Sequence, residues 1–129
     1  METFDAPVPE PVPPGEPLRV PLAEIEDSFG KKLLYVARDG STQEVVVARV
    51  HGELRAADTY CPHEGGRIAD GPLMDETYFH CPLHLYRFDS TTGEADGVPC
   101  PPLATARVTV EGDQALVWVH ELPLEHEPQ

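Results

Sequence analysis

Two short cysteine–histidine segments constrain this chain more than any other feature of its sequence. The first is Cys61-Pro62-His63, and Cys81-Pro82-Leu83-His84 follows further along the chain. Thiolate and imidazole groups are preferred protein ligands of zinc and iron, so the four side chains form a complete ligand set for a metal centre. Proline fixes the backbone angle φ and has no N–H group. We therefore expect Pro62 and Pro82 to stiffen the two loops that present the ligands.

The order of the ligands separates two kinds of metal site. Zinc modules with two cysteines and two histidines usually take them as a cysteine pair and a histidine pair around a short helix. Here each segment contributes one cysteine and one histidine. That interleaving suits a Rieske-type [2Fe–2S] cluster, in which one iron takes two cysteines and the other takes two histidines. A zinc site stays the alternative.

The rest of the body predicts an all-β fold. Turn sequences such as Asp39-Gly40 and Glu111-Gly112 separate short runs of β-branched and aromatic residues at hairpin spacing, and only residues 21–27 could form a helical turn. We predict an antiparallel β sandwich or barrel, with Val46, Phe88, Val108 and Trp118 in its core. The predicted strand runs are residues 33–38, 44–51, 53–58, 77–81, 104–110 and 115–120.

Proline and charge divide the chain into one body and two tails. The chain has 129 residues, 15 of them proline, which is enough for one compact domain. Residues 1–17 are rich in proline and acidic residues and offer little apolar surface to bury, so they predict a disordered arm. Residues 121–129 resemble them and predict a second tail. The single domain is then expected to span residues 18–120.

The charge balance limits the classes of partner. Acidic residues outnumber basic ones by 23 to 9, for a formal net charge of -14. Such a chain would repel nucleic-acid phosphates and anionic lipid headgroups, so neither nucleic acid nor a membrane is an expected partner. We find no apolar run of the length that a signal peptide or a membrane span needs. The sequence therefore predicts a cytoplasmic location.

With their flanking residues, the two ligand segments make the chain resemble the soluble Rieske-type ferredoxins over roughly residues 18–120. The resemblance implies a Rieske fold, in which an antiparallel β base carries a small cluster-binding subdomain of loops at about residues 60–103. It also implies one [2Fe–2S] cluster per chain, with Cys61 and Cys81 on the buried iron and His63 and His84 on the iron nearer solvent. The flanking matches are Glu64-Gly65-Gly66, Asp70-Gly71, Arg87-Phe88-Asp89, Thr92-Gly93 and Gly97-Val98-Pro99-Cys100-Pro101-Pro102-Leu103.

Departures from the family pattern imply a low reduction potential. High-potential members carry two further cysteines that form a disulfide, and a serine and a tyrosine that donate hydrogen bonds to the cluster sulfurs. Gly66 and Leu83 stand at the two cysteine positions here, and Tyr86 and Phe88 stand at the serine and tyrosine positions. With fewer donors to the sulfurs, the potential should lie near the low end of the roughly -150 to +300 mV Rieske range.

The resemblance also implies the partners. Ferredoxins of this family pass one electron at a time from a flavoprotein reductase to the terminal oxygenase of a multicomponent system. We therefore expect a monomeric electron carrier without catalytic residues. The alternative is the small subunit of an assimilatory nitrite reductase, which would bind the large subunit of that enzyme, and a zinc-binding structural module is the third possibility. Arg67 and Arg87 are candidate partner contacts, and Cys100 is expected to be a half-buried thiol.

Overall fold

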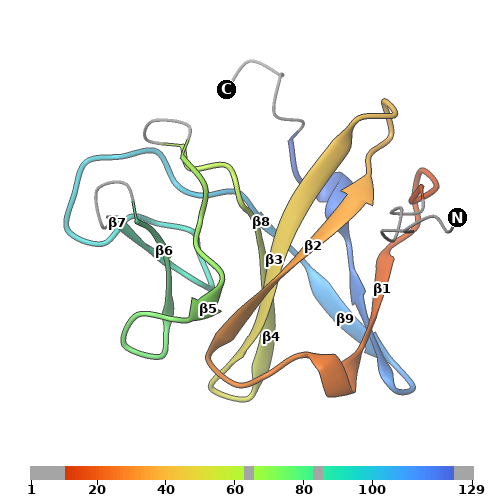
Figure 1. Cartoon of the computed structure of the whole chain (residues 1–129), viewed down its shortest axis with the longest axis horizontal. Coiled ribbons are helices and arrows are strands. Elements are labelled where there is room, and N and C mark those ends of the chain that lie inside the picture. The colour runs from red at the N-terminus through yellow and green to blue at the C-terminus, as the bar shows by residue number, and fades with distance from the viewer. Residues whose placement is uncertain (1–10, 63–65, 83–85, 124–129) are drawn as a thin grey trace, which may run out of the picture.

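The computed structural model describes residues 11–62, 66–82 and 86–123, and the described chain consists mainly of short strands (Figure 1). The strand pairs are antiparallel, which confirms the predicted all-β class. Neither of the short 3-10 turns in these ranges has the length or apolar character of a membrane-spanning helix. The elements are β1 (Leu18–Pro21), η1 (Leu22–Glu24), β2 (Phe29–Val36), β3 (Thr42–Val50), β4 (Glu53–Asp58), β5 (Gly71–Pro72), β6 (Tyr78–Cys81), β7 (Tyr86–Asp89), β8 (Thr105–Ala106), β9 (Val108–Glu111), β10 (Gln114–Val117) and η2 (Val119–Glu121).

The strands form a two-sheet base and a smaller hairpin beside it. One sheet of the base has the order β1-β10-β9, and the other has the order β5-β2-β3-β4-β8. The hairpin β6-β7 lies beside the second sheet in a small subdomain, which we define as residues 59–103 (Figure 1). This is the predicted arrangement of a β-sandwich base that carries a subdomain of loops.

Strand β3 is buried on both faces and joins the two parts of the molecule. Successive side chains of a strand point to opposite faces. Val45 and Val47 accordingly belong to the base core, whereas Val46 and Ala48 belong to a second apolar cluster that extends into the small subdomain. All four side chains are 0% exposed. The base core and the subdomain therefore pack on opposite faces of the same strand.

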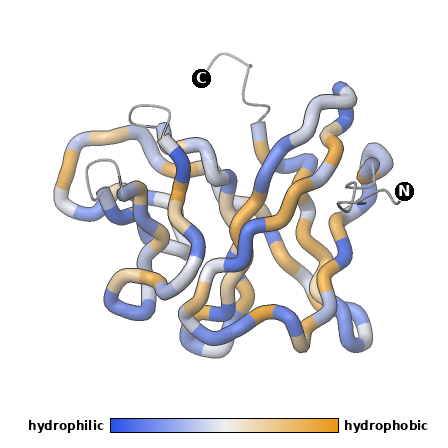
Figure 2. Tube along the Cα trace, viewed as in Figure 1, coloured by the Kyte–Doolittle hydropathy of each residue, from blue (hydrophilic) through white to orange (hydrophobic). Residues whose placement is uncertain are grey.

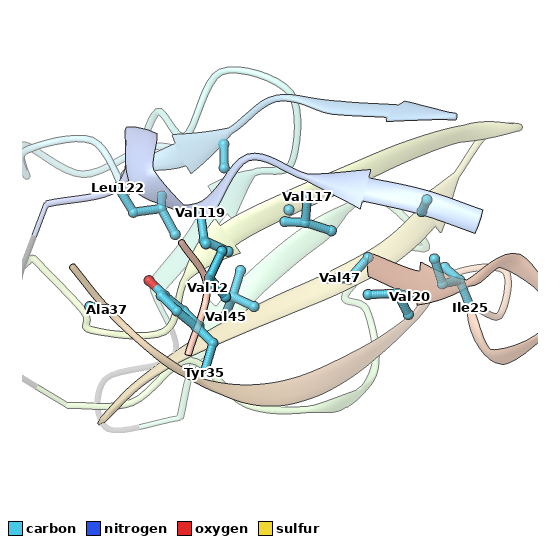
Figure 3. Packing of buried hydrophobic residues seen from close by; sticks show 13 residues of the cluster. Val12, Val20, Ile25, Tyr35, Ala37, Val45, Val47, Val117, Val119 and Leu122 are labelled. Atoms are coloured by element: carbon cyan, nitrogen blue, oxygen red, sulfur yellow. The ribbon is translucent and has the colours of Figure 1, made fainter. Parts of the chain in front are cut away.

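The base core lies between the two sheets, where valine side chains predominate (Figure 3). Val20 of β1 and Val117 of β10 come from the three-stranded sheet, and Tyr35 of β2 comes from the other sheet. Hydrophobic residues follow the strands of the base, whereas several of the turns between them are hydrophilic (Figure 2). Burial of such apolar surface is the main driving force for folding.

Residues 11–13 contact the base, although they fall within the disordered arm that the sequence predicts over residues 1–17. Val12 is only 6% exposed and packs in the base core with Val119 (Figure 3). Its N–H donates to Val36 O at 3.2 Å. The ring of His120 makes 3.0 Å hydrogen bonds to the carbonyl oxygens of Val12 and Pro13. Contacts with β2, Val119 and His120 therefore hold this proline-rich segment against the base core.

The C-terminal boundary also lies later than predicted. Leu122 is 2% exposed and belongs to the base core. The Glu121 carboxylate accepts hydrogen bonds from the backbone N–H and side chain of Arg107. Because Arg107 N is bound to Glu121, the predicted run 104–110 splits into β8 and β9 at this residue. The described part of residues 121–129 thus belongs to the domain.

Two of the four predicted core residues are less buried than expected. Val46 and Phe88 are 0% exposed, but Val108 and Trp118 are only partly buried. The Trp118 ring lies under the Arg107 guanidinium, with 4.8 Å from Arg107 Cζ to the ring centroid. Its Nε1–H donates to Thr109 Oγ1 at 3.0 Å. A tryptophan can thus cover the edge of a core and keep a polar partner.

Shortening Val12 tests whether this segment contributes to the domain. Val12→Ala should lower the free energy of unfolding by about 2 kcal/mol, because it leaves a cavity in the base core. Val110→Ala is the matched control, since Val110 is 57% exposed; it should change the free energy of unfolding by less than about 0.5 kcal/mol. Urea denaturation measures both values, and equal effects would mean that Val12 does not pack in solution.

Candidate metal centre

The first ligand segment lies in the tip of a hairpin that follows β4. The neck of this hairpin is closed by two backbone hydrogen bonds of 2.8 Å, from Ile68 N to Thr59 O and from Cys61 N to Gly66 O. Cys61 is 1% exposed. The predicted ligand His63 lies outside the described residues. The fold therefore places Cys61 at the inner end of the hairpin tip.

The second ligand segment has an equivalent position in the β6-β7 hairpin. Cys81 pairs with Tyr86, and Phe79 pairs with Phe88 further down the hairpin. Cys81 is 2% exposed. The predicted ligand His84, three residues after Cys81 in the sequence, lies outside the described residues. In both segments, then, the cysteine is a buried residue at the end of a hairpin arm.

A backbone contact holds the two hairpins side by side. Ala69 N, on the arm that returns from the first hairpin, donates to His80 O at 2.8 Å. Cys61 and Cys81 belong to the same apolar cluster, which also contains Leu103. Burial lowers the pKa of His80, as expected when desolvation disfavours the charged imidazole. The hairpins therefore bring the two thiols to one apolar region.

A third loop covers this region and carries the remaining cysteine. Leu103 N donates to Gly93 O at 2.7 Å, which fixes the return of the proline-rich segment onto the turn after β7. Cys100 is half-buried, as expected, and packs against the cluster that contains Cys61. Burial raises the pKa of the Cys100 thiol, and the electrostatic influence of the neighbouring Cys61 raises it further. Cys100 is therefore disfavoured as a thiolate.

Arg67 and Arg87, the two arginines predicted to contact a partner, make contacts within the chain. The Arg87 guanidinium donates to Asp75 Oδ2 at 2.6 Å and to the Asp96 carboxylate. Its Cζ also lies 4.6 Å from the Tyr78 ring centroid. The hydrogen bond to Asp96, together with that to Asp75, raises the pKa of Arg87. Arg67 lies on the returning arm of the first hairpin, and its Nη1 donates to Thr59 Oγ1 at 3.2 Å.

The described side chains fit a metal centre that takes sulfur ligands. None of the three cysteines of the chain forms a disulfide. Two buried thiols in one apolar cluster, each at the end of a rigid hairpin arm, provide soft donors for a buried iron or zinc ion. Among the described residues, which do not include His63 and His84, no three or more His, Cys, Asp or Glu side chains are grouped so that they could hold a metal ion.

The contacts that organise this region were missed by the sequence reasoning. The link from Ala69 to His80 uses backbone atoms, so no residue type signals it. For the contact between Gly93 and Leu103, the glycine itself is a partial sequence signal. Glycine tolerates a positive φ, and Gly93 has a φ of +80°. The hydrogen bonds of Thr59 involve residues far apart in the sequence.

The chain matches the family model described as the Rieske [2Fe-2S] domain over residues 12–108. It is 38% identical over 76 residues to the ferredoxin component of the p-cumate 2,3-dioxygenase system of Pseudomonas putida, a match that covers 58% of this chain and 64% of that relative. It is 31% identical over 101 residues to the 3-phenylpropionate/cinnamic acid dioxygenase ferredoxin subunit of Photorhabdus laumondii, with 78% and 90% covered.

The chain also superposes on solved structures of ferredoxins. The ferredoxin of carbazole 1,9a-dioxygenase from Nocardioides aromaticivorans superposes with a TM-score of 0.66 at 27% identity, covering 81% of this chain and 98% of that one. A complex of reduced oxygenase and oxidized ferredoxin in carbazole 1,9a-dioxygenase superposes with a TM-score of 0.65 at 26% identity. The match covers 81% of this chain and 93% of that one. A putative nitrite reductase small subunit superposes with a TM-score of 0.53 at 17% identity, over 78% of this chain and 97% of that one. This match shows a similar fold.

Gly93 offers a test of the loop packing. An added Cβ would lie 2.0 Å from Leu103 O, whereas at Gly40, with a φ of +87°, it would meet no atom within 4 Å. Gly40→Ala should therefore cost only the backbone strain, about 1 kcal/mol. Gly93→Ala should cost at least about 3 kcal/mol, because the loop must also move. Urea denaturation of both variants measures the difference, and equal costs would contradict the packing.

Proposed function

This chain belongs to the Rieske [2Fe–2S] domain family, and we propose that it is the one-electron carrier of an oxygenase system. The observation that carries the proposal is the pair of buried thiols, Cys61 and Cys81, at adjoining hairpin ends in a chain that matches this family over residues 12–108. A Rieske cluster takes up and releases a single electron. The chain itself transforms no substrate in this proposal.

The proposed ligands are the four residues of the two segments. Cys61 and Cys81 would hold the buried iron, and their low exposure supports this role. His63 and His84 would hold the outer iron, because each follows one of the cysteines by two or three residues in the sequence. Neutral imidazoles in place of two thiolates leave the centre with less negative charge, so it is more easily reduced than an all-cysteine centre.

The surroundings of the thiols support the low potential expected from the sequence. Phe88 is 0% exposed in the same apolar cluster as Cys61 and Cys81. Its side chain has no hydroxyl to donate to a cluster sulfur, and hydrogen bonds to the sulfurs are one determinant of the potential. We therefore propose a reduction potential near the lower end of the Rieske range.

Names of similar proteins support a terminal oxygenase as the electron acceptor. The relatives at 38% and 31% identity are ferredoxin components of dioxygenase systems. One solved neighbour is a ferredoxin bound to its oxygenase. We propose a flavoprotein reductase as the donor, a monomeric carrier and a cytoplasmic location. The likeness to a nitrite reductase small subunit, at 17% identity, supports a shared fold alone.

Metal and sulfide analysis tests the proposed centre. The protein purified without air should contain about two irons and two acid-labile sulfides per chain and should accept one electron. The reduced protein should give the EPR signal of low average g value that mixed histidine and cysteine ligation produces. Cys81→Ser should lose this centre, and His84→Cys should either lose it or shift the signal toward the all-cysteine type.

Cys100→Ser is the matched control for these variants. Cys100 packs beside the same cluster but is not a proposed ligand, so its replacement should keep the iron, the sulfide and the EPR signal. Zinc without sulfide in the unaltered protein would overturn the proposal. An unchanged spectrum for His84→Cys would overturn the ligand assignment.

Reconstitution tests the place of the carrier between its partners. The flavoprotein reductase and terminal oxygenase encoded nearest to this chain, supplied with NADH, O2 and the oxygenase substrate, should form hydroxylated product only when the intact protein is added. Cys81→Ser should abolish product formation and Cys100→Ser should preserve it. A requirement for this chain by a sirohaem nitrite reductase, with no effect on any oxygenase, would favour the alternative.

A further inference from the structure

A chain of polar contacts joins the base to the neck of the first hairpin. Lys32 Nζ of β2 lies 3.9 Å from Glu44 Oε1 of β3. The Thr59 hydroxyl donates to the same Glu44 oxygen at 2.9 Å, and Arg67 Nη1 donates to the Thr59 hydroxyl at 3.2 Å. The contacts thus run from two strands of the base to both arms of the hairpin. Thr59 is the link between the two parts.

The Thr59 hydroxyl is well placed to act as this link. Thr59 is 0% exposed. A hydroxyl has one hydrogen and two lone pairs, so it can donate to the Glu44 carboxylate and accept from the Arg67 guanidinium at the same time. Hydrogen bonds with an ionised partner are stronger than those between neutral groups. Removal of this buried hydroxyl would take one partner from the half-buried Glu44 carboxylate and one from the exposed Arg67 guanidinium.

The backbone of Thr59 takes part in the same hairpin. Its carbonyl accepts the hydrogen bond from Ile68 N that closes the neck. Cys61 follows two residues later, with its own N–H bound to Gly66 O. The main chain of Thr59 therefore joins the two arms to each other, while its side chain joins them to β3.

We propose that Thr59 is a positioning residue for the metal centre. Its hydroxyl holds the first hairpin against β3, so that the Cys61 thiol keeps its place relative to Cys81. The inference rests on the proposed function, because it concerns retention of the iron centre held by these thiols. Thr59 acts through Cys61 and Glu44 and is not itself a ligand.

Retention of iron by two variants of Thr59, with a variant of Thr109 as the control, tests the inference. Thr59→Val keeps the shape of the side chain but removes the hydroxyl, and it should release iron to a chelator about tenfold faster, the change expected from loss of hydrogen bonds to charged groups. The EPR signal of its reduced form should shift or broaden. Thr59→Ser keeps the hydroxyl and should restore both the release rate, to within about twofold, and the EPR signal.

Thr109→Val is the matched control. It removes the hydroxyl that accepts the hydrogen bond from Trp118 Nε1 in the base. It should lower the unfolding temperature but leave the iron-release rate and the EPR signal unchanged, when each variant is compared at the same interval below its own unfolding temperature. Wild-type release and a wild-type spectrum for Thr59→Val would overturn the inference, and so would an equal effect of Thr109→Val.

A second pair of variants keeps the test decisive if Thr59→Val does not fold. Glu44→Leu removes the acceptor of the Thr59 hydroxyl, and Lys32→Met removes the other partner of Glu44 while it leaves Thr59 intact. Glu44→Leu should speed iron release severalfold and Lys32→Met should not. Equal rates would overturn the inference, whereas absence of iron and sulfide from the unaltered protein would overturn the proposed function instead.

Discussion

Burial of β3 on both faces is the constraint on which the rest of this structure depends. Val45 and Val47 pack in the base core, and Val46 and Ala48 pack against the subdomain that holds the cysteines. A one-residue slip in the register of β3 would exchange these two sets of side chains. Pairing with β2 on one side and β4 on the other opposes such a slip. The subdomain therefore has a fixed place on the base.

The geometry of the proposed centre depends on backbone contacts more than on the ligands themselves. Each cysteine ends a hairpin arm, and the hydrogen bond from Ala69 N to His80 O sets the distance between the two hairpins. The close approach of Gly93 to Leu103 then brings the third loop over them. These backbone contacts hold Cys61 and Cys81 in one apolar cluster.

Positive charge in the described parts of the chain is largely engaged in internal contacts. Arg87 binds two carboxylates and Arg107 binds Glu121, while Arg67 donates to Thr59. Since acidic residues outnumber basic ones by 23 to 9, the surface left for a partner is predominantly acidic. For the proposed electron transfer, a partner with a basic docking face would be complementary.

The sequence by itself determined the β class and which residues are candidate ligands of a metal centre. The candidate ligands Cys61, His63, Cys81 and His84 are recognised by their type and spacing, and short runs of β-branched and aromatic residues between turn sequences mark the strands. Only the tertiary structure decided that Val12 and Leu122 belong to the core and that the two hairpins lie side by side. Burial of those residues needs partners from distant segments, and a backbone hydrogen bond between hairpins has no signature in the side chains.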